Sequence, residues 1–156
     1  MNERSVAHDT FVIERTYGAP PARVFKAWAE PAAKARWFAG AGEPGNGYEL
    51  DFRVGGREVN RGGPPDGPVY LFDARYHEIV DGERFVFSYD MYADATCISV
   101  SVTTVELRSE GAGTRLVYTE QGAFFDGHDT SEQRREGTAG LLDALGISLE
   151  QTASAR

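Results

Sequence analysis

Apolar and polar residues alternate near the start of the chain, and this alternation predicts a β-strand. Within residues 9–17, Phe11 and Ile13 fall on one face, whereas Glu14 and Thr16 fall on the other. Successive side chains of a strand point to opposite faces, so a period of two indicates a strand with one buried face. We therefore expect the first strand to cover this segment.

The same alternation returns at residue 47 and predicts six further strands. They cover residues 47–54, 57–61, 69–80, 85–91, 96–107 and 114–124. Their connections are mostly short and contain turn residues, such as Gly55-Gly56 and Asp81-Gly82. Consecutive strands joined by short turns pair antiparallel. The seven strands therefore predict one antiparallel sheet.

Two short helices are predicted between the first strand and the second. The segment 18–31 has prolines where a helix begins, at positions that need no N–H donor, and a proline again where it ends. Val24, Phe25 and Trp28 share its inner face. A second helix is expected over residues 32–38, followed by a glycine-rich loop.

The longest helical pattern runs over residues 129–151. We expect Asp129 to cap its first turn, with Glu132 reaching back as in a capping box. An arc of about 100° suits packing on a sheet, and four leucines share such an arc: Leu141, Leu142, Leu145 and Leu149.

Beside the leucines lies a stripe of small residues: Gly137, Gly140, Ala144 and Ser148. A glycine inside a helix costs about 0.5–1 kcal/mol relative to alanine, so each glycine there needs a local reason. Close approach of another backbone and room for a ligand would both explain it. Of the two, we favour close packing.

These elements predict an α+β fold formed by a single domain over residues 1–156. A curved antiparallel seven-stranded sheet would wrap around the long C-terminal helix, with the two short helices after the first strand. The space between sheet and helix is then the natural cavity.

Composition excludes several classes of function. The formal charge of −8 and the pI near 4.9 oppose binding to a phosphate backbone, so we expect no nucleic-acid partner. The N-terminus has no apolar run of signal-peptide length, and no window approaches 18 apolar residues, so we expect a cytoplasmic protein without a membrane association.

Metal and cofactor chemistry has little support. Cys97 is the single cysteine, and His8, His77 and His128 lie far apart in the sequence. We therefore expect no metal site and no cofactor. A homodimer stays open, because the edge strands of such a sheet need covering or charge.

Aromatic residues make up 12% of the chain and could line the cavity. The strands and short helices supply the aromatic candidates Trp37, Phe52, Tyr70, Phe72, Tyr89, Tyr118 and Phe124. The long helix adds Leu141, Leu142 and Leu145, and two carboxylates, Glu58 and Glu120, complete the candidate ligand-binding set. The alternative is that these side chains fill a closed core.

An enzyme of cyclase, dehydratase or hydrolase type is a second hypothesis. Its candidate acids and bases are Glu58, His77, Asp90 and Glu120. Glu120 shares a face with Tyr118, which makes it the first catalytic candidate, whereas His77 is expected to face solvent. The chain contains no G-x-S-x-G motif, so a serine hydrolase has no support.

Several stretches in this order resemble one known family. They are ARVFKAW ending at Trp28, KARWF ending at Phe38, DFRVGG at residues 51–56, ARYHEIVDGERFVFSYDM, SVTTVEL with GAGTRL, and TEQGAFFDG at residues 119–127. Together they resemble the SRPBCC (START-like) superfamily and, more narrowly, the family grouped with the activator of the ninety-kilodalton heat-shock protein ATPase. Many members have a tryptophan soon after the glycine of the last helix, where this chain has Thr138.

The resemblance implies a helix-grip fold, which agrees with the residue pattern. It implies no single activity, since the superfamily includes lipid carriers, cyclases, hormone-binding proteins and co-chaperones. A chaperone-assisting role in the stress response is therefore a third hypothesis, although related co-chaperones carry a further N-terminal domain. Binding of a small apolar or aromatic ligand is the function we favour.

Overall fold

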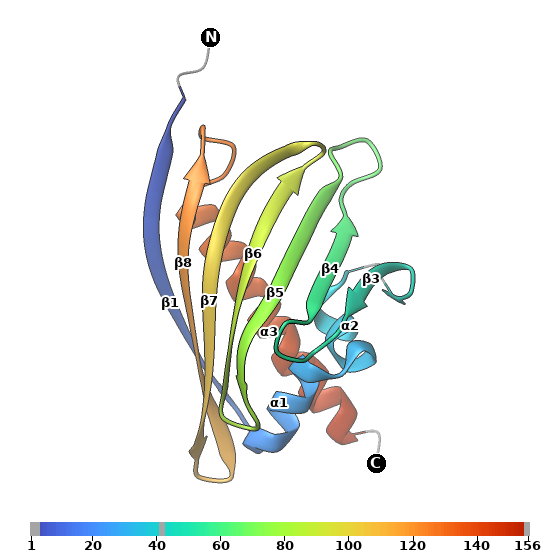
Figure 1. The fold of residues 1–156 in the computed structure, drawn as a ribbon. Helices are drawn as coiled ribbons and strands as arrows, with labels where there is room; N and C mark the ends of the chain where they lie inside the picture. The colour runs from blue at the N-terminus through green and yellow to red at the C-terminus, as the bar shows by residue number, and fades with distance from the viewer. Residues whose placement is uncertain (1–3, 41–42, 155–156) are drawn as a thin grey trace.

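Across residues 4–40 and 43–154, the computed structural model contains eight strands and three helices (Figure 1). The strands are β1 (Val6–Tyr17), β2 (Glu43–Pro44), β3 (Gly47–Leu50), β4 (Arg57–Gly62), β5 (Tyr70–Val80), β6 (Arg84–Ala93), β7 (Thr96–Glu110) and β8 (Gly113–Phe125). The helices are α1 (Pro21–Ala29), α2 (Pro31–Phe38) and α3 (Ser131–Ser154).

All strands belong to one sheet with the order β1-β8-β7-β6-β5-β4-β3-β2. Seven of them pair antiparallel, as the alternation predicts. The eighth, β2, is a two-residue strand that pairs parallel with β3 inside the segment expected to be a loop. Two residues are too few to show a period, so the sequence pattern could not reveal it.

The second predicted strand is shorter than expected. It was expected over residues 47–54, but β3 ends at Leu50 and a turn follows. The Gly56 N–H donates to the Arg53 carbonyl at 2.7 Å, and the Asp51 N–H donates to the Arg57 carbonyl at 2.9 Å. A Cβ at Gly56 would lie 2.0 Å from the Asp51 carbonyl oxygen, so this turn requires a glycine. Phe52 faces the core although it lies beyond the end of β3. The apolar–polar alternation in the sequence therefore continues past the strand.

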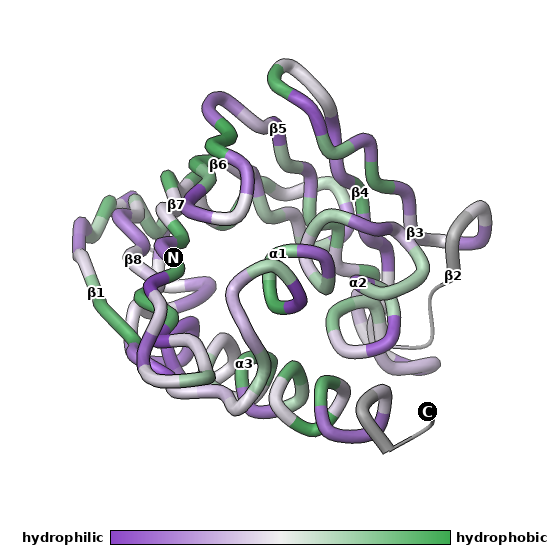
Figure 2. Tube along the Cα trace, turned by 90° about the horizontal axis from the view of Figure 1, so that it is seen from below, coloured by the Kyte–Doolittle hydropathy of each residue, from purple (hydrophilic) through white to green (hydrophobic). Residues whose placement is uncertain are grey.

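The three helices lie on the concave side of the bent sheet, as predicted, and the helix-grip arrangement is confirmed (Figure 2). Leu142, Leu145 and Leu149 are buried in the core. The Tyr17 hydroxyl donates to the Leu142 carbonyl of α3 at 2.7 Å, which ties the middle of this helix to the end of β1.

The first turn of α3 is capped one residue later than predicted. The Thr130 hydroxyl accepts from the Gln133 N–H at 3.1 Å, which is the bond of an N-cap residue. Asp129 Oδ1 instead accepts from the N–H of this cap residue, Thr130, at 2.8 Å. The predicted cap at Asp129 is therefore wrong. The second oxygen of this carboxylate, Oδ2, accepts a hydrogen bond from Arg134.

Close packing does not explain Gly137 and Gly140. A Cβ at either position would meet no heavy atom within 4 Å beyond its own helix backbone. The preference for close backbone approach is thus wrong at both positions. The α3 glycine with a close neighbour is Gly146, where a Cβ would lie 3.2 Å from the Tyr17 ring.

Candidate functional site

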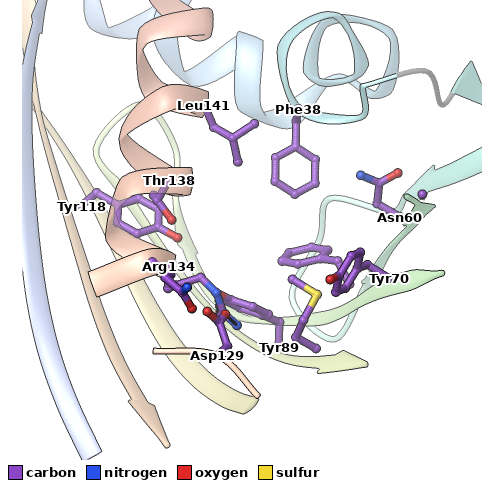
Figure 3. A pocket seen from close by; sticks show the side chains of 14 residues that line it. Phe38, Asn60, Tyr70, Tyr89, Tyr118, Asp129, Arg134, Thr138 and Leu141 are labelled. Atoms are coloured by element: carbon purple, nitrogen blue, oxygen red, sulfur yellow. Dashed lines mark hydrogen bonds and ion pairs between the residues drawn. The ribbon is translucent and has the colours of Figure 1, made fainter. Parts of the chain in front are cut away.

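The candidate site is an open pocket of about 370 Å³ between the first half of α3 and the inner face of β4 to β6 (Figure 3). The backbone of α3 approaches β1 and α2 more closely than it approaches the central strands, so space remains on this side. The pocket is lined by Phe38, Asn60, Gly62, Tyr70, Phe72, Tyr89, Met91, Tyr118, Asp129, Gln133, Arg134, Gly137, Thr138 and Leu141.

Aromatic rings form much of the pocket wall. The rings of Phe38 and Phe72 are 5.0 Å apart, and those of Phe72 and Tyr89 are 4.7 Å apart. Leu141 covers the helix side, and Tyr70 lies at the exposed rim, with 42% of its surface accessible. Rings at these separations form a continuous apolar surface against which a flat molecule can pack.

Arg134 occupies the floor of the pocket and is only 8% exposed. Its Nη1 donates to the Tyr89 hydroxyl at 2.8 Å and to Glu120 Oε2 at 3.2 Å. Its Nη2 donates to the Ser99 hydroxyl at 2.7 Å and to Asp129 Oδ2 at 2.8 Å. Burial alone would lower the pKa of the Arg134 guanidinium, but its interactions with Tyr89 and with the carboxylates of Glu120 and Asp129 outweigh burial and raise this pKa.

Glu120 lies beneath the pocket, with both carboxylate oxygens occupied. Its Oε2 accepts from Tyr89 at 2.6 Å and from Ser101 at 2.8 Å, in addition to Arg134. Its Oε1 accepts from Tyr118 at 3.1 Å. Burial, followed by the charge of Glu120, raises the pKa of both tyrosines, so both hydroxyls stay protonated at neutral pH.

The structure divides the predicted ligand-binding residues into those that line the pocket and those that lie elsewhere. Five line it: Tyr70, Phe72, Tyr89, Tyr118 and Leu141. Glu120 lies beneath it, and the ring of Phe124 is 5.2 Å from the Arg134 guanidinium carbon. Trp37, Leu142 and Leu145 are buried in the core, and Phe52 packs at its edge.

Glu58 belongs to a second, closed cluster. Its Oε2 accepts from Lys34 Nζ at 2.8 Å and from the Tyr48 hydroxyl at 2.6 Å, and its Oε1 accepts from the Tyr76 hydroxyl at 2.6 Å. The ammonium group also lies 4.2 Å from the centre of the Phe38 ring. Burial lowers the pKa of Lys34, and the charge of Glu58 opposes this shift. The cluster ties α2 to β3, β4 and β5.

The remaining acid-base candidates lie away from the pocket. His77 is exposed, as expected, and its Nε2 lies 2.6 Å from the Ser88 hydroxyl on the outer face. Asp90 is half-buried on the same face, between the inward-facing Tyr89 and Met91. The structure therefore does not bring either residue together with Glu120.

The polar half of the pocket was not predicted from the sequence. Arg134 precedes Thr138 by one helical turn and Leu141 by two, so all three lie on one face of α3. This spacing was visible in the sequence. Asn60 gave no comparable signal, since it is one polar residue among several in a short strand.

Two classes of site find no support in the described residues. Within residues 4–40 and 43–154, no three His, Cys, Asp or Glu side chains are grouped as metal ligands would be. Over the same ranges, none of the helices combines the length and the hydropathy that crossing a bilayer requires.

Solved structures resemble this chain closely. Mll3558 from Rhizobium loti is 51% identical, covers 92% of this chain and 99% of its own, and superposes with a TM-score of 0.85. An uncharacterized protein from Rhizobium leguminosarum is 45% identical, with coverages of 96% and 99% and a TM-score of 0.89. CV1439 from Chromobacterium violaceum is 28% identical, with coverages of 90% and 96% and a TM-score of 0.70. No curated protein matched the chain.

A family model supplies the remaining comparison. The model described as "Activator of Hsp90 ATPase homolog 1-like protein" matches residues 18–150, which include all three helices up to the last turn of α3 and most of the sheet. The resemblance drawn from the sequence motifs is thereby confirmed. The chain belongs to the family of Activator of Hsp90 ATPase homolog 1-like proteins.

Proposed function

We propose that this protein binds a small, mostly apolar or aromatic molecule in the pocket between α3 and β4 to β6. The observation that carries the proposal is an open pocket with aromatic walls above a buried polar network. Small-molecule sites in proteins commonly combine these two features and have volumes of about 300–1,000 Å³. The family and the fold support a ligand-binding domain in general terms.

The network beneath the pocket favours binding over catalysis. Four donors already occupy the oxygens of Glu120, and this residue does not line the pocket. A general acid or base must come within hydrogen-bond reach of the substrate proton. Glu120 can meet this condition only if Arg134 or a tyrosine moves away. Glu120 is therefore better suited to holding Arg134 and the tyrosines in place than to acting as a catalytic acid or base.

The chaperone-assisting hypothesis rests on the family description alone. Copurification with a chaperone, or stimulation of its ATPase activity by the purified protein, would be the evidence for it. The homodimer and the cytoplasmic location also stay predictions.

Two glycines of α3 provide a matched test of the pocket. Gly137 lines it and Gly140 does not, although both have open space beside them. A tryptophan at position 137 should fill the pocket, whereas a tryptophan at position 140 should leave it free. Both substitutions remove a helix glycine, so their effects on helix propensity are similar.

The experiment measures binding of the uncharged fluorophore N-phenyl-1-naphthylamine by fluorescence titration. We expect saturable binding to the unmodified protein, about tenfold or more weaker binding to Gly137→Trp, and unchanged binding to Gly140→Trp. Equal affinities of the two variants, or no saturable binding at all, would contradict the proposal. Native mass spectrometry of protein from its own host would then search for the natural ligand.

A further inference from the structure

The Thr138 hydroxyl is an accessible polar group at the wall of the pocket. The residue lines the pocket and is 7% exposed. Among the residues that the structure describes, none hydrogen bonds to this hydroxyl. A hydroxyl that faces a pocket and has no protein partner can donate a hydrogen bond to a ligand or accept one from it.

A second unpaired group lies on the opposite side. Asn60 lines the pocket from β4, and its Oδ1 is buried without a hydrogen-bond partner in the described structure. Figure 3 shows Asn60 across the pocket from Thr138 and Tyr118, with the ring of Phe38 on one side between them. Figure 3 shows the amide nitrogen of Asn60 on the pocket side and Oδ1 on the far side, so in this orientation the carboxamide offers its donor to the pocket.

The charges at the pocket floor select against anions. Arg134 is the cation that an anionic ligand would seek, but it already pairs with Glu120 at 3.2 Å and with Asp129 at 2.8 Å. One positive charge therefore faces two negative charges. A carboxylate or phosphate placed beside them would be repelled and would also lose its hydration.

We propose that the pocket selects an uncharged aromatic molecule that carries a hydroxyl group at each end, one bound by Thr138 and the other by Asn60. This inference rests on the proposed function and adds the polarity and charge of the ligand to it. The Tyr118 hydroxyl donates to Glu120, so its lone pairs can accept a further bond from the group that meets Thr138.

Three molecules with one ring system test this selection: naphthalene, naphthalene-2,6-diol and naphthalene-2,6-dicarboxylate. Their affinities are measured by following backbone amide NMR shifts of the full chain. We expect the diol to bind about tenfold or more tighter than naphthalene, and the dicarboxylate to bind more weakly than naphthalene.

Two variants remove the polar groups with little change in shape, Thr138→Val and Asn60→Leu. Each should weaken binding of the diol about three- to tenfold and leave binding of naphthalene unchanged. The control Thr119→Val alters an outward-facing threonine of β8 and should change neither affinity. Naphthalene binding also confirms that each variant is folded.

Equal affinities for naphthalene and the diol, or an unchanged affinity for the diol in both variants, would overturn this inference alone. Preference for the dicarboxylate would overturn it as well. If none of the three molecules binds to the unmodified protein, the proposed function fails together with it.

Discussion

Arg134 shows how one residue can organise a site. It contacts Tyr89 and Asp129, which line the pocket, and Glu120 beneath it, and it remains 8% exposed. Its hydrogen-bond partners Tyr89, Ser99 and Glu120 lie on β6, β7 and β8, and Asp129 lies in the segment before α3. The side chain therefore fixes the position of the first turns of α3 over the sheet.

Loss of the Arg134 charge should lower the free energy of unfolding strongly. Arg134→Met leaves Glu120 buried without its cation, and breaking a buried pair from one side costs about 3–5 kcal/mol. Urea unfolding of the variant measures this loss. The neighbouring Arg135 is exposed, and Arg135→Met should change the free energy of unfolding by less than about 0.5 kcal/mol. A loss for Arg134→Met as small as that for Arg135→Met would show that the network does not stabilise the fold.

Lys34 should behave in the same way in the closed cluster. Both Lys34 and Glu58 are buried, so Lys34→Met should cost about 3–5 kcal/mol in urea unfolding. Lys26 makes an exposed pair with Glu30 at 3.7 Å, and Lys26→Met should cost less than about 1 kcal/mol. The double variant Lys34→Met, Glu58→Leu should recover much of the loss. A double variant as unstable as the single one would argue against an uncompensated charge as the cause.

At the scale of elements, α3 divides into two halves with different inner faces. Its buried face begins with Arg134 and Thr138 and continues with Leu142, Leu145 and Leu149. The leucine half closes the core, and the polar half faces the pocket. This division accounts for Gly137, which lines the pocket, but the structure gives no reason for Gly140.

Two glycines of α3, Gly140 and Gly146, should respond differently to substitution by alanine. Gly140→Ala meets open space and should stabilise the protein by about 0.5–1 kcal/mol. Gly146→Ala gains the same helix propensity, but its Cβ would lie 3.2 Å from the Tyr17 ring, so the net change should be smaller or destabilising. Thermal unfolding of both variants measures the difference. A larger gain at position 146 would contradict the tight contact with β1.

The two adjacent leucines of α3 should also differ. Leu142 is 1% exposed and Leu142→Ala should cost about 2–5 kcal/mol in urea unfolding. Leu141 is half-buried beside the pocket, so Leu141→Ala should cost less. A cost below about 1 kcal/mol for Leu142→Ala would place it at the surface.

The sequence predicted the elements better than it predicted the pocket. Periodicity shows which side chains face inward, and it did so for the strands, for α1 and for the leucines of α3. It cannot separate core from pocket, because both lie on the inner face. Phe87 and Tyr89 are neighbours on that face of β6, yet only Tyr89 lines the pocket. The difference arises from the distance between α3 and the sheet, which packing decides.

For the whole molecule, the position of α3 determines where a ligand can enter. The helix packs against β1, α1 and α2, and it leaves β4 to β6 uncovered near its first turns (Figure 1). The central claim is that this uncovered region binds an aromatic molecule. Other hollows exist, such as the groove on the outer face lined by Val100 and Val102, so the location of binding is the decisive question.

The most direct measurement is to follow backbone amide NMR shifts while N-phenyl-1-naphthylamine is titrated into the unmodified protein. The proposal predicts that the largest shifts fall on residues around the pocket, including Phe72, Tyr89 and Thr138. Shifts concentrated on the outer face around Val100 and Val102, with the pocket residues unchanged, would contradict it.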